Sequence, residues 1–226
     1  AIFQCKPVSS CEASNEEDLI QELHLFHLAE YFLESFYKRA KLYSVNLPRK
    51  HSWNAKGTFV GMVTTEIPRK PTDGSEDDCT LLFKTFLAAP LLLCDGLYKE
   101  RKFCGNTDIT QNEDSLGLVI DAYVYHTLLD SGKTVLLSDL QGIIAPNATV
   151  TLFDPQAHTI NQLSGHWDQG EAQIQIYLQD HQCNTICHAL KLHLDDEDNS
   201  TGKKDHALSD TIHTNSHKHP LQLGFN

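Results

Sequence analysis

The chain has 226 residues and is 40% hydrophobic, so it can bury one good-sized core. Its formal net charge of −12 argues against general binding to nucleic acid or to an anionic membrane, because no basic surplus exists to displace counterions. No apolar run approaches the roughly 18 residues of a membrane-spanning helix, and no secretory leader is visible. Seven loosely spaced cysteines, an odd number, favour a reducing, intracellular (cytoplasmic) setting over a disulfide framework.

The N-terminal part is predicted to hold a short strand and a long helix. Residues 1–6, AIFQCK, read as a strand that ends in a lysine. Apolar residues then recur every three or four positions across residues 16–41, with Asn15 as the expected N-cap and acidic residues in the first turn. We expect this helix to pack one face on the core. The alternative is an amphipathic helix that binds a partner.

The middle of the chain mixes strands, loops and a second helix. Residues 58–65 and 80–88 are predicted strands, separated by a loop over residues 69–78 that is rich in Pro, Asp, Gly and Ser. The apolar run 90–98 has no defined period, and residues 98–114 are predicted to form a polar loop. Residues 116–129 are apolar and predict a helix.

Residues 134–158 hold the first candidate site. The short apolar runs 134–137 and 149–153 predict buried strands, which lead to Asp139 and Gln141 and to Asp154 respectively. A carboxylate at a strand's end can face a cleft while the strand holds it in place. Two acids and an amide are oxygen donors that suit Mg²⁺, which indicates phosphoryl transfer. The alternative is a solvated surface turn.

A second candidate site, of metal type, follows the loop at residues 164–170. Residues 171–192 predict one helix or two short ones. Within them, Cys183 and Cys187 are four apart and would share a helical face, with His181 just before them. One more ligand would complete a tetrahedral structural Zn²⁺. The candidates for it are His126, His158 and His188. The alternative is two buried free cysteines beside a surface histidine.

Residues 195–226 are polar and rich in histidine, without apolar periodicity. They predict a disordered tail after a folded domain at residues 1–194.

The order DLQG, LFDPQAHT, a Gly/Asp loop and HQCNTIC resembles the alpha-kinase family, atypical protein kinases that include myosin heavy chain kinases and elongation factor 2 kinase. LFDPQAHT followed by SGHWDQG is most similar to the fungal branch. The resemblance implies an α+β, two-lobed, protein-kinase-like fold over residues 1–194, with a zinc-stabilised C-lobe.

The resemblance also implies roles for the residues of the first candidate site. Asp139 and Gln141 would engage magnesium and the nucleotide phosphates. Asp154 would be the catalytic aspartate, which orients or deprotonates the substrate hydroxyl. Lys6 sits where the family has a strand lysine that contacts the α and β phosphates of ATP.

For the metal cluster, the resemblance makes His181, Cys183 and Cys187 three of four structural zinc ligands. The family's fourth ligand is a histidine in a segment of the form AFSHF. Here the segment reads AYVYH, residues 122–126, so that His126 is displaced by one position.

The implied function is ATP- and Mg²⁺-dependent phosphorylation of serine or threonine in a protein substrate, without a nucleic acid or membrane partner. Three departures favour an alternative, an inactive zinc-stabilised remnant that acts as a binding or scaffold domain. The family's nucleotide loop should precede the Lys6 strand, so the N-lobe is expected to be truncated. Lys84 stands at the hinge position where the family has an acidic residue. Trp167 and Gln173 replace glycines of the substrate-side loop.

Overall fold

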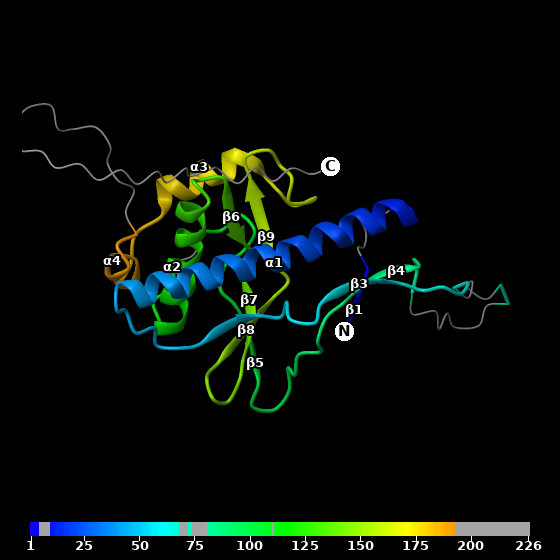
Figure 1. Cartoon of the computed structure of the whole chain (residues 1–226), viewed down its shortest axis with the longest axis horizontal. Helices are drawn as coiled ribbons and strands as arrows, with labels where there is room; N and C mark the ends of the chain where they lie inside the picture. Colours follow the sequence, from blue (N-terminus) through cyan, green and yellow to red (C-terminus); the bar gives the residue numbers. More distant parts are fainter. Residues whose placement is uncertain (5–9, 68–71, 74–80, 110, 193–226) are drawn as a thin grey trace, which may run out of the picture. The chain divides into compact units, whose positions relative to one another are not determined.

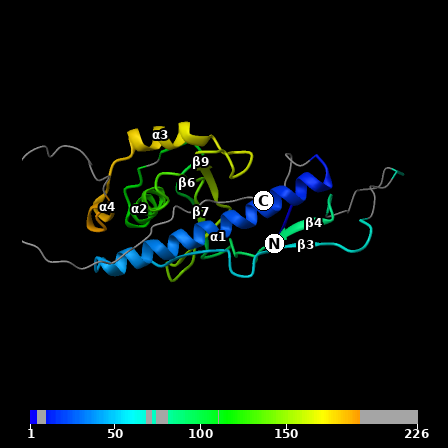
Figure 2. The ribbon, with the colours of Figure 1, turned by 45° about the horizontal axis from the view of Figure 1, so that its top comes forward.

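The computed structural model describes residues 1–4, 10–67, 72–73, 81–109 and 111–192. Lys6, the predicted phosphate-contacting lysine, and the predicted tail at residues 195–226 lie outside the described residues. Residues 1–194 form one unit, and its elements are shown in Figure 1 and, turned by 45°, in Figure 2. Within the described part of the chain, no helix is long and apolar enough to cross a membrane.

A long helix, α1 (Glu12–Leu42), packs on one other helix and on three strands of this unit (Figures 1 and 2). It begins four residues earlier than predicted, because Cys11 is the N-cap. The prediction of Asn15 as N-cap was wrong. Asn15 is fully buried inside the helix, and its Nδ2 donates to the Thr85 carbonyl at 2.9 Å. Its side chain therefore joins the helix to a strand, and the predicted core-facing stripe is confirmed by its buried face.

The N-terminal half of α1 packs on a three-stranded antiparallel sheet in the order β1-β4-β3. The strands are β1 (Ile2–Phe3), β4 (Thr85–Ala88) and β3 (Phe59–Met62). Glu12, in the first turn of α1, accepts hydrogen bonds from the backbone amides of Lys84 and Thr85 at 2.8 and 2.7 Å. This carboxylate fixes the start of β4 to the start of the helix.

The C-terminal half of α1 packs on the second predicted helix, α2 (Ser115–Asp130), and on β2 (His51–Trp53). A buried chain of hydrogen bonds joins the three elements. The Trp53 indole donates to the Tyr123 hydroxyl at 3.0 Å, and that hydroxyl donates to the Ala29 carbonyl at 2.6 Å. Apolar α2 is buried on several sides, which matches its lack of an amphipathic period.

Two further sheets carry the remaining strands. The four-stranded sheet has the order β2-β8-β7-β5, with β8 (Val150–Phe153), β7 (Gln141–Ile144) and β5 (Lys99–Lys102). The prediction that residues 98–114 form only a loop was therefore wrong, because β5 pairs along β7. The sequence KERK of β5 has no apolar residue, since the strand lies at the sheet's edge and is largely exposed. β6 (Val135–Ser138) and β9 (Gln156–Thr159) form a two-stranded sheet.

The C-terminal helices are α3 (Gly170–Asp180), which packs on β9, and α4 (Thr185–Ala189), which packs on α2. Of the two alternatives predicted for residues 171–192, the structure has the pair of short helices. The Asn184 side chain caps α4 and also donates to the Leu118 carbonyl at 2.9 Å. At the other end of α1, Arg39 donates to the Leu190 carbonyl at 2.8 Å. These contacts tie α4 to α2 and the residue that follows α4 to the C-terminal end of α1.

Candidate active site and metal centre

Asp139 and Asp154 occupy equivalent positions in a kinked hairpin. The chain runs β6, Asp139–Leu140, β7, and returns as β8, Asp154–Pro155, β9. β6 pairs with β9 and β7 pairs with β8. Register places Ser138 opposite Gln156 and Gln141 opposite Phe153, so the two kinks face each other across the hairpin. Both aspartates have φ of 53°, an unusual value for a non-glycine residue that aspartate tolerates better than most.

Polar side chains converge at these kinks. The amide Nε2 of Gln141 donates to Asp154 Oδ2 at 3.0 Å. Lys102, at the end of β5, forms an ion pair with Asp139, with 2.5 Å between Nζ and Oδ1. Register explains its place, because Lys102 pairs with Gln141 in the neighbouring strand. The structure therefore brings Asp139, Gln141 and Asp154 together, as the sequence predicts, and adds a lysine that the sequence reasoning missed.

Burial and neighbouring charge raise the pKa of two acids, Asp154 and Glu22. Partial desolvation, reinforced by the charge of Asp139, raises the pKa of Asp154, while the Gln141 hydrogen bond and the charge of Lys102 oppose the rise. Burial, with the charge of Asp154 as a smaller cause, raises the pKa of Glu22 in α1 to about 8. The negative charge of one carboxylate disfavours ionisation of a neighbouring carboxyl group. Glu22 was not singled out from the sequence, because it lies among other acids on the helix.

These acids open on a cavity of about 400 Å³ between α1, β4 and the β8–β9 kink. Asp18, Glu22 and Asp154 supply carboxylates to its wall. Apolar side chains of α1, β1 and β4, together with the loop before α3, supply much of the rest. Among the described residues that line the cavity, none is lysine or arginine.

The raised pKa of Glu22 gives a prediction for stability against pH. In the unfolded chain the Glu22 carboxyl ionises at its ordinary pKa of 4.5, whereas in the folded chain it stays neutral up to about pH 8. The stability that this difference contributes is complete below pH 4.5 and is lost as pH rises through about 8. In urea titrations, Glu22→Gln should flatten this decline and be more stable than the parent at high pH, by on the order of 2 kcal/mol. Glu17→Gln, an exposed position on the same helix, should track the parent. Parallel pH curves for Glu22→Gln and the parent would contradict the assignment.

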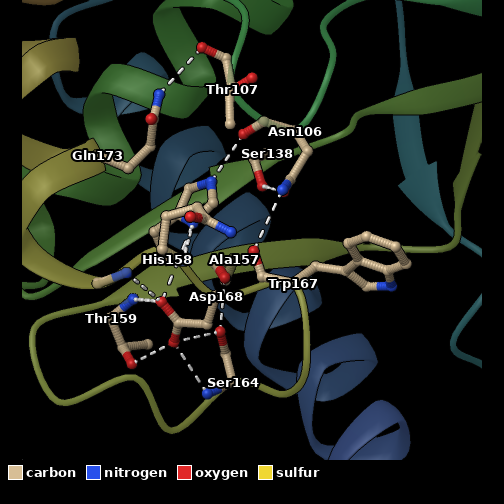
Figure 3. Close-up of polar contacts among 12 residues, drawn as sticks. Asn106, Thr107, Ser138, Ala157, His158, Thr159, Ser164, Trp167, Asp168 and Gln173 are labelled. Atoms are coloured by element: carbon tan, nitrogen blue, oxygen red, sulfur yellow. Dashed lines mark hydrogen bonds and ion pairs between the residues drawn. The ribbon is translucent and has the colours of Figure 1, made fainter. Parts of the chain in front are cut away.

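The wall of the cavity that precedes α3 is held by a buried carboxylate, Asp168 (Figure 3). Its oxygens accept five hydrogen bonds of 2.7–3.0 Å, two from Thr159, two from Ser164 and one from the Gly170 amide. Burial alone would raise the pKa of Asp168, but these hydrogen bonds outweigh it and lower the pKa. The carboxylate therefore stays ionised and ties the loop to β9.

His158 extends the same network. Its Nδ1 accepts from the Gln169 amide at 2.9 Å, so Nε2 carries the proton and donates to the Asn106 carbonyl at 2.7 Å. Asn106 in turn donates to the Trp167 carbonyl at 3.1 Å and accepts from Ser138 Oγ at 3.1 Å. Figure 3 shows these contacts, with the Trp167 ring pointing away from the network.

The replaced glycines do not prevent this loop from forming. The positive φ values fall on Gly165 (112°) and Gly170 (71°), which the sequence retains. Trp167 is not among the residues with positive φ, and Gln173 lies inside α3, where its Nε2 donates to the Thr107 carbonyl at 3.0 Å. In this structure neither position has a positive φ, so the loop forms here without the backbone freedom of glycine at Trp167 and Gln173.

Asp168→Asn should destabilise the fold by about 2–4 kcal/mol. An amide group would present N–H donors to some of the five donors that now face the carboxylate. Thermal and urea unfolding measure the loss, and limited proteolysis in residues 160–169 should become faster. Asp95→Asn, an exposed aspartate, is the matched control. Equal stability of the two variants would show that the network carries little of the loop's order.

The metal-type residues meet at the α3–α4 junction. The ligand atoms of His181, Cys183 and Cys187 all lie within 4.8 Å of one another. Cys187 is fully buried, and burial lowers the pKa of His181 to about 4, so its imidazole is neutral, the form that binds metals. Two thiols and an imidazole suit Zn²⁺. These residues fit the expected ion.

None of the candidates for a fourth ligand joins this group. His126 is buried against α1, and its Nε2 lies 3.3 Å from Ser35 Oγ. Both ring nitrogens of His158 are engaged with Asn106 and Gln169, and exposed His188 lies outside the group. Tyr125, the residue before His126, stacks on the His181 ring with 4.0 Å between centroids.

The fold and these sites define a class of protein. The sequence profile of the alpha-kinase family matches residues 4–187, and the chain belongs to this family. The predicted membership of the alpha-kinase family is thereby confirmed. Comparison with curated proteins gives no match.

Solved structures with a similar fold include domains of myosin heavy chain kinase A. The alpha-kinase domain in complex with AMP is 19% identical, with a TM-score of 0.58, covering 82% of this chain and 64% of that one. The apoenzyme domain has a TM-score of 0.57 at 19% identity, with coverage of 84% and 64%. An inactive variant in complex with ATP gives 0.57 at 19% identity, with coverage of 79% and 60%. The chain thus spans less than two thirds of the length of these relatives.

Proposed function

We propose that this chain transfers the γ-phosphate of ATP to a serine or threonine hydroxyl of a protein substrate, with Mg²⁺ as cofactor. Membership of the alpha-kinase family supports a kinase. The observation that carries the proposal is the facing pair of kinks, which places two aspartates and a glutamine together. One of them, Asp154, lines a cavity of about 400 Å³.

Asp139, Asp154 and the carbonyl oxygen of Gln141 are the proposed magnesium ligands. Carboxylate and amide oxygens are the donors that this hard cation takes from proteins. When bound, Mg²⁺ neutralises charge on the phosphates. The Gln141 amide nitrogen already donates to Asp154, so its oxygen is left to face the ion.

Asp154 is the proposed base. The substrate oxygen bonds to the γ-phosphorus, the bond to the β–γ bridging oxygen breaks, and the hydroxyl proton passes to Asp154. Its raised pKa makes it a stronger base than an ordinary aspartate. Lys102 offsets part of the acidic charge of the site through its ion pair with Asp139.

The cavity is the proposed nucleotide site. Leu19, Leu25 and Leu87 give the cavity apolar walls that suit the adenine ring of ATP. Lys84, expected at the hinge, does not line it and forms an ion pair with Glu66 at 3.1 Å. Lys6 remains the proposed contact to the phosphates, by resemblance alone.

A structural Zn²⁺ on His181, Cys183 and Cys187, a position in the fungal branch and an intracellular setting complete the proposal. The motif order LFDPQAHT and SGHWDQG supports the branch. The sparse, odd set of cysteines supports the setting.

A binding or scaffold domain without catalysis is the second candidate. The cavity favours this candidate in one respect, because the carboxylates of Asp18 and Asp154 face it and none of its described lining residues is lysine or arginine. Such a wall repels phosphates unless its negative charge is offset by magnesium or by a cationic group outside the described lining residues.

Calorimetry separates the two candidates. The kinase proposal expects Mg-ATP to bind with a micromolar to millimolar Kd, and binding to weaken at least tenfold without magnesium or in Asp139→Ala. Asp95→Ala should bind as the parent does. Absence of Mg-ATP binding by a folded chain would favour the scaffold.

A further inference from the structure

The zinc-type group has three ligands on one side and an aromatic ring on another. His181 caps the end of α3, Cys183 precedes α4 and Cys187 lies within α4. Cys183 Sγ lies 3.8 Å from His181 Nε2, which is close to the separation of two donors on one ion. The Asn184 side chain accepts from the Ile186 and Cys187 amides, so local hydrogen bonds hold the backbone of Cys187 in place.

Two tyrosines cover the imidazole of this group. The Tyr125 ring lies nearly parallel to the His181 ring, at 27° and 4.0 Å, and the Tyr177 ring lies at 20° and 5.1 Å. Tyr125 is buried in α2, the helix on which α4 packs. The next residue, His126, projects about 100° away around the helix. There it contacts Ser35 and lies 5.5 Å, between ring centroids, from Phe36 of α1.

We infer that this chain binds Zn²⁺ through three protein ligands only, His181, Cys183 and Cys187. Tyr125 occupies the place from which α2 would supply a fourth, and the remaining position is taken by water or a small thiol. Zn²⁺ prefers four ligands, and sites with three protein ligands keep one exchangeable position. Among the described residues, no fourth histidine, cysteine or acid joins the group. The ion should therefore exchange faster than one in a closed four-ligand site.

Variants at positions 125 and 126 test this inference by competition of the full-length zinc-loaded protein with a coloured chelator. Tyr125→His should supply the fourth donor and strengthen zinc retention at least tenfold. Tyr125→Phe and His126→Ala should retain zinc as the parent does, within about twofold. The double variant Cys183→Ser, Cys187→Ser measures the background of zinc retained by the histidines of residues 195–226. Weaker retention in Tyr125→Phe or His126→Ala would overturn the inference, because it would reveal a fourth protein ligand.

Cobalt spectroscopy tests the parent chain without relying on any variant's folding. Co²⁺ at one equivalent should show thiolate-to-metal charge transfer, absent from the double cysteine variant. Added 2-mercaptoethanol should then increase that band, since a third thiolate enters the exchangeable position. A cobalt spectrum that the thiol leaves unchanged would mean that the site is closed. Absence of the band would mean that the group binds no metal. Either result refutes the inference.

Discussion

Replacing Asp154 by alanine will abolish phosphoryl transfer while leaving the protein folded. Asp154 lies at an exposed kink, where its side chain accepts a hydrogen bond from Gln141. Its loss removes the base and a magnesium ligand together. We expect the rate of transfer to fall at least a thousandfold, equivalent to roughly 4 kcal/mol of transition-state stabilisation.

The control for this prediction is Asp95→Ala, an exposed aspartate outside the site, which should keep full activity. Thermal unfolding should give the same or a slightly higher midpoint for Asp154→Ala than for the parent, because charge repulsion between Asp154 and Asp139 is relieved. Activity of Asp154→Ala within tenfold of the parent would remove Asp154 from the chemistry.

Replacing Cys187 by serine will destabilise the part of the chain around α4. Cys187 is fully buried among apolar side chains, and burial raises the pKa of its free thiol to about 12. A zinc ion would hold it as the thiolate instead and would contribute its binding free energy to folding. Serine loses the ion and leaves a buried hydroxyl, so we expect a loss of several kcal/mol.

Thermal unfolding with and without a strong chelator measures this effect. The parent should melt at a lower temperature with the chelator, and Cys187→Ser should melt low in both conditions. Cys94→Ser, at an exposed cysteine, should behave like the parent. If chelation does not move the melting temperature of the parent, the ion has no structural role.

The candidate active site was largely predictable, because its residues are marked by local patterns. Short apolar runs before Asp139 and Asp154 identified both strands. The structure adds that the two runs belong to one hairpin, kinked twice at matching positions. Gln141 needed no separate argument, since it lies two residues beyond Asp139.

The contributions of Lys102 and Asp168 depend on tertiary contacts that no local pattern reveals. Lys102 lies on an exposed edge strand without apolar alternation, and only its register with Gln141 brings it to the site. Asp168 resembles any loop aspartate until its five donors, which come from both sides of the loop, are assembled around it. The N-cap prediction for Asn15 was wrong for the same reason, because a residue type that favours N-caps is used here for a tertiary contact with Thr85.

The most direct test of the proposed function is transfer of γ-phosphate from Mg-ATP to serine or threonine. The parent and Asp154→Ala, prepared in parallel, are incubated with radiolabelled ATP and a mixture of Ser/Thr peptides, and the modified residues are identified by mass spectrometry. We expect phosphoserine or phosphothreonine with the parent and none above background with Asp154→Ala. Equal incorporation in both, or none by a parent chain that binds Mg-ATP, would contradict the account.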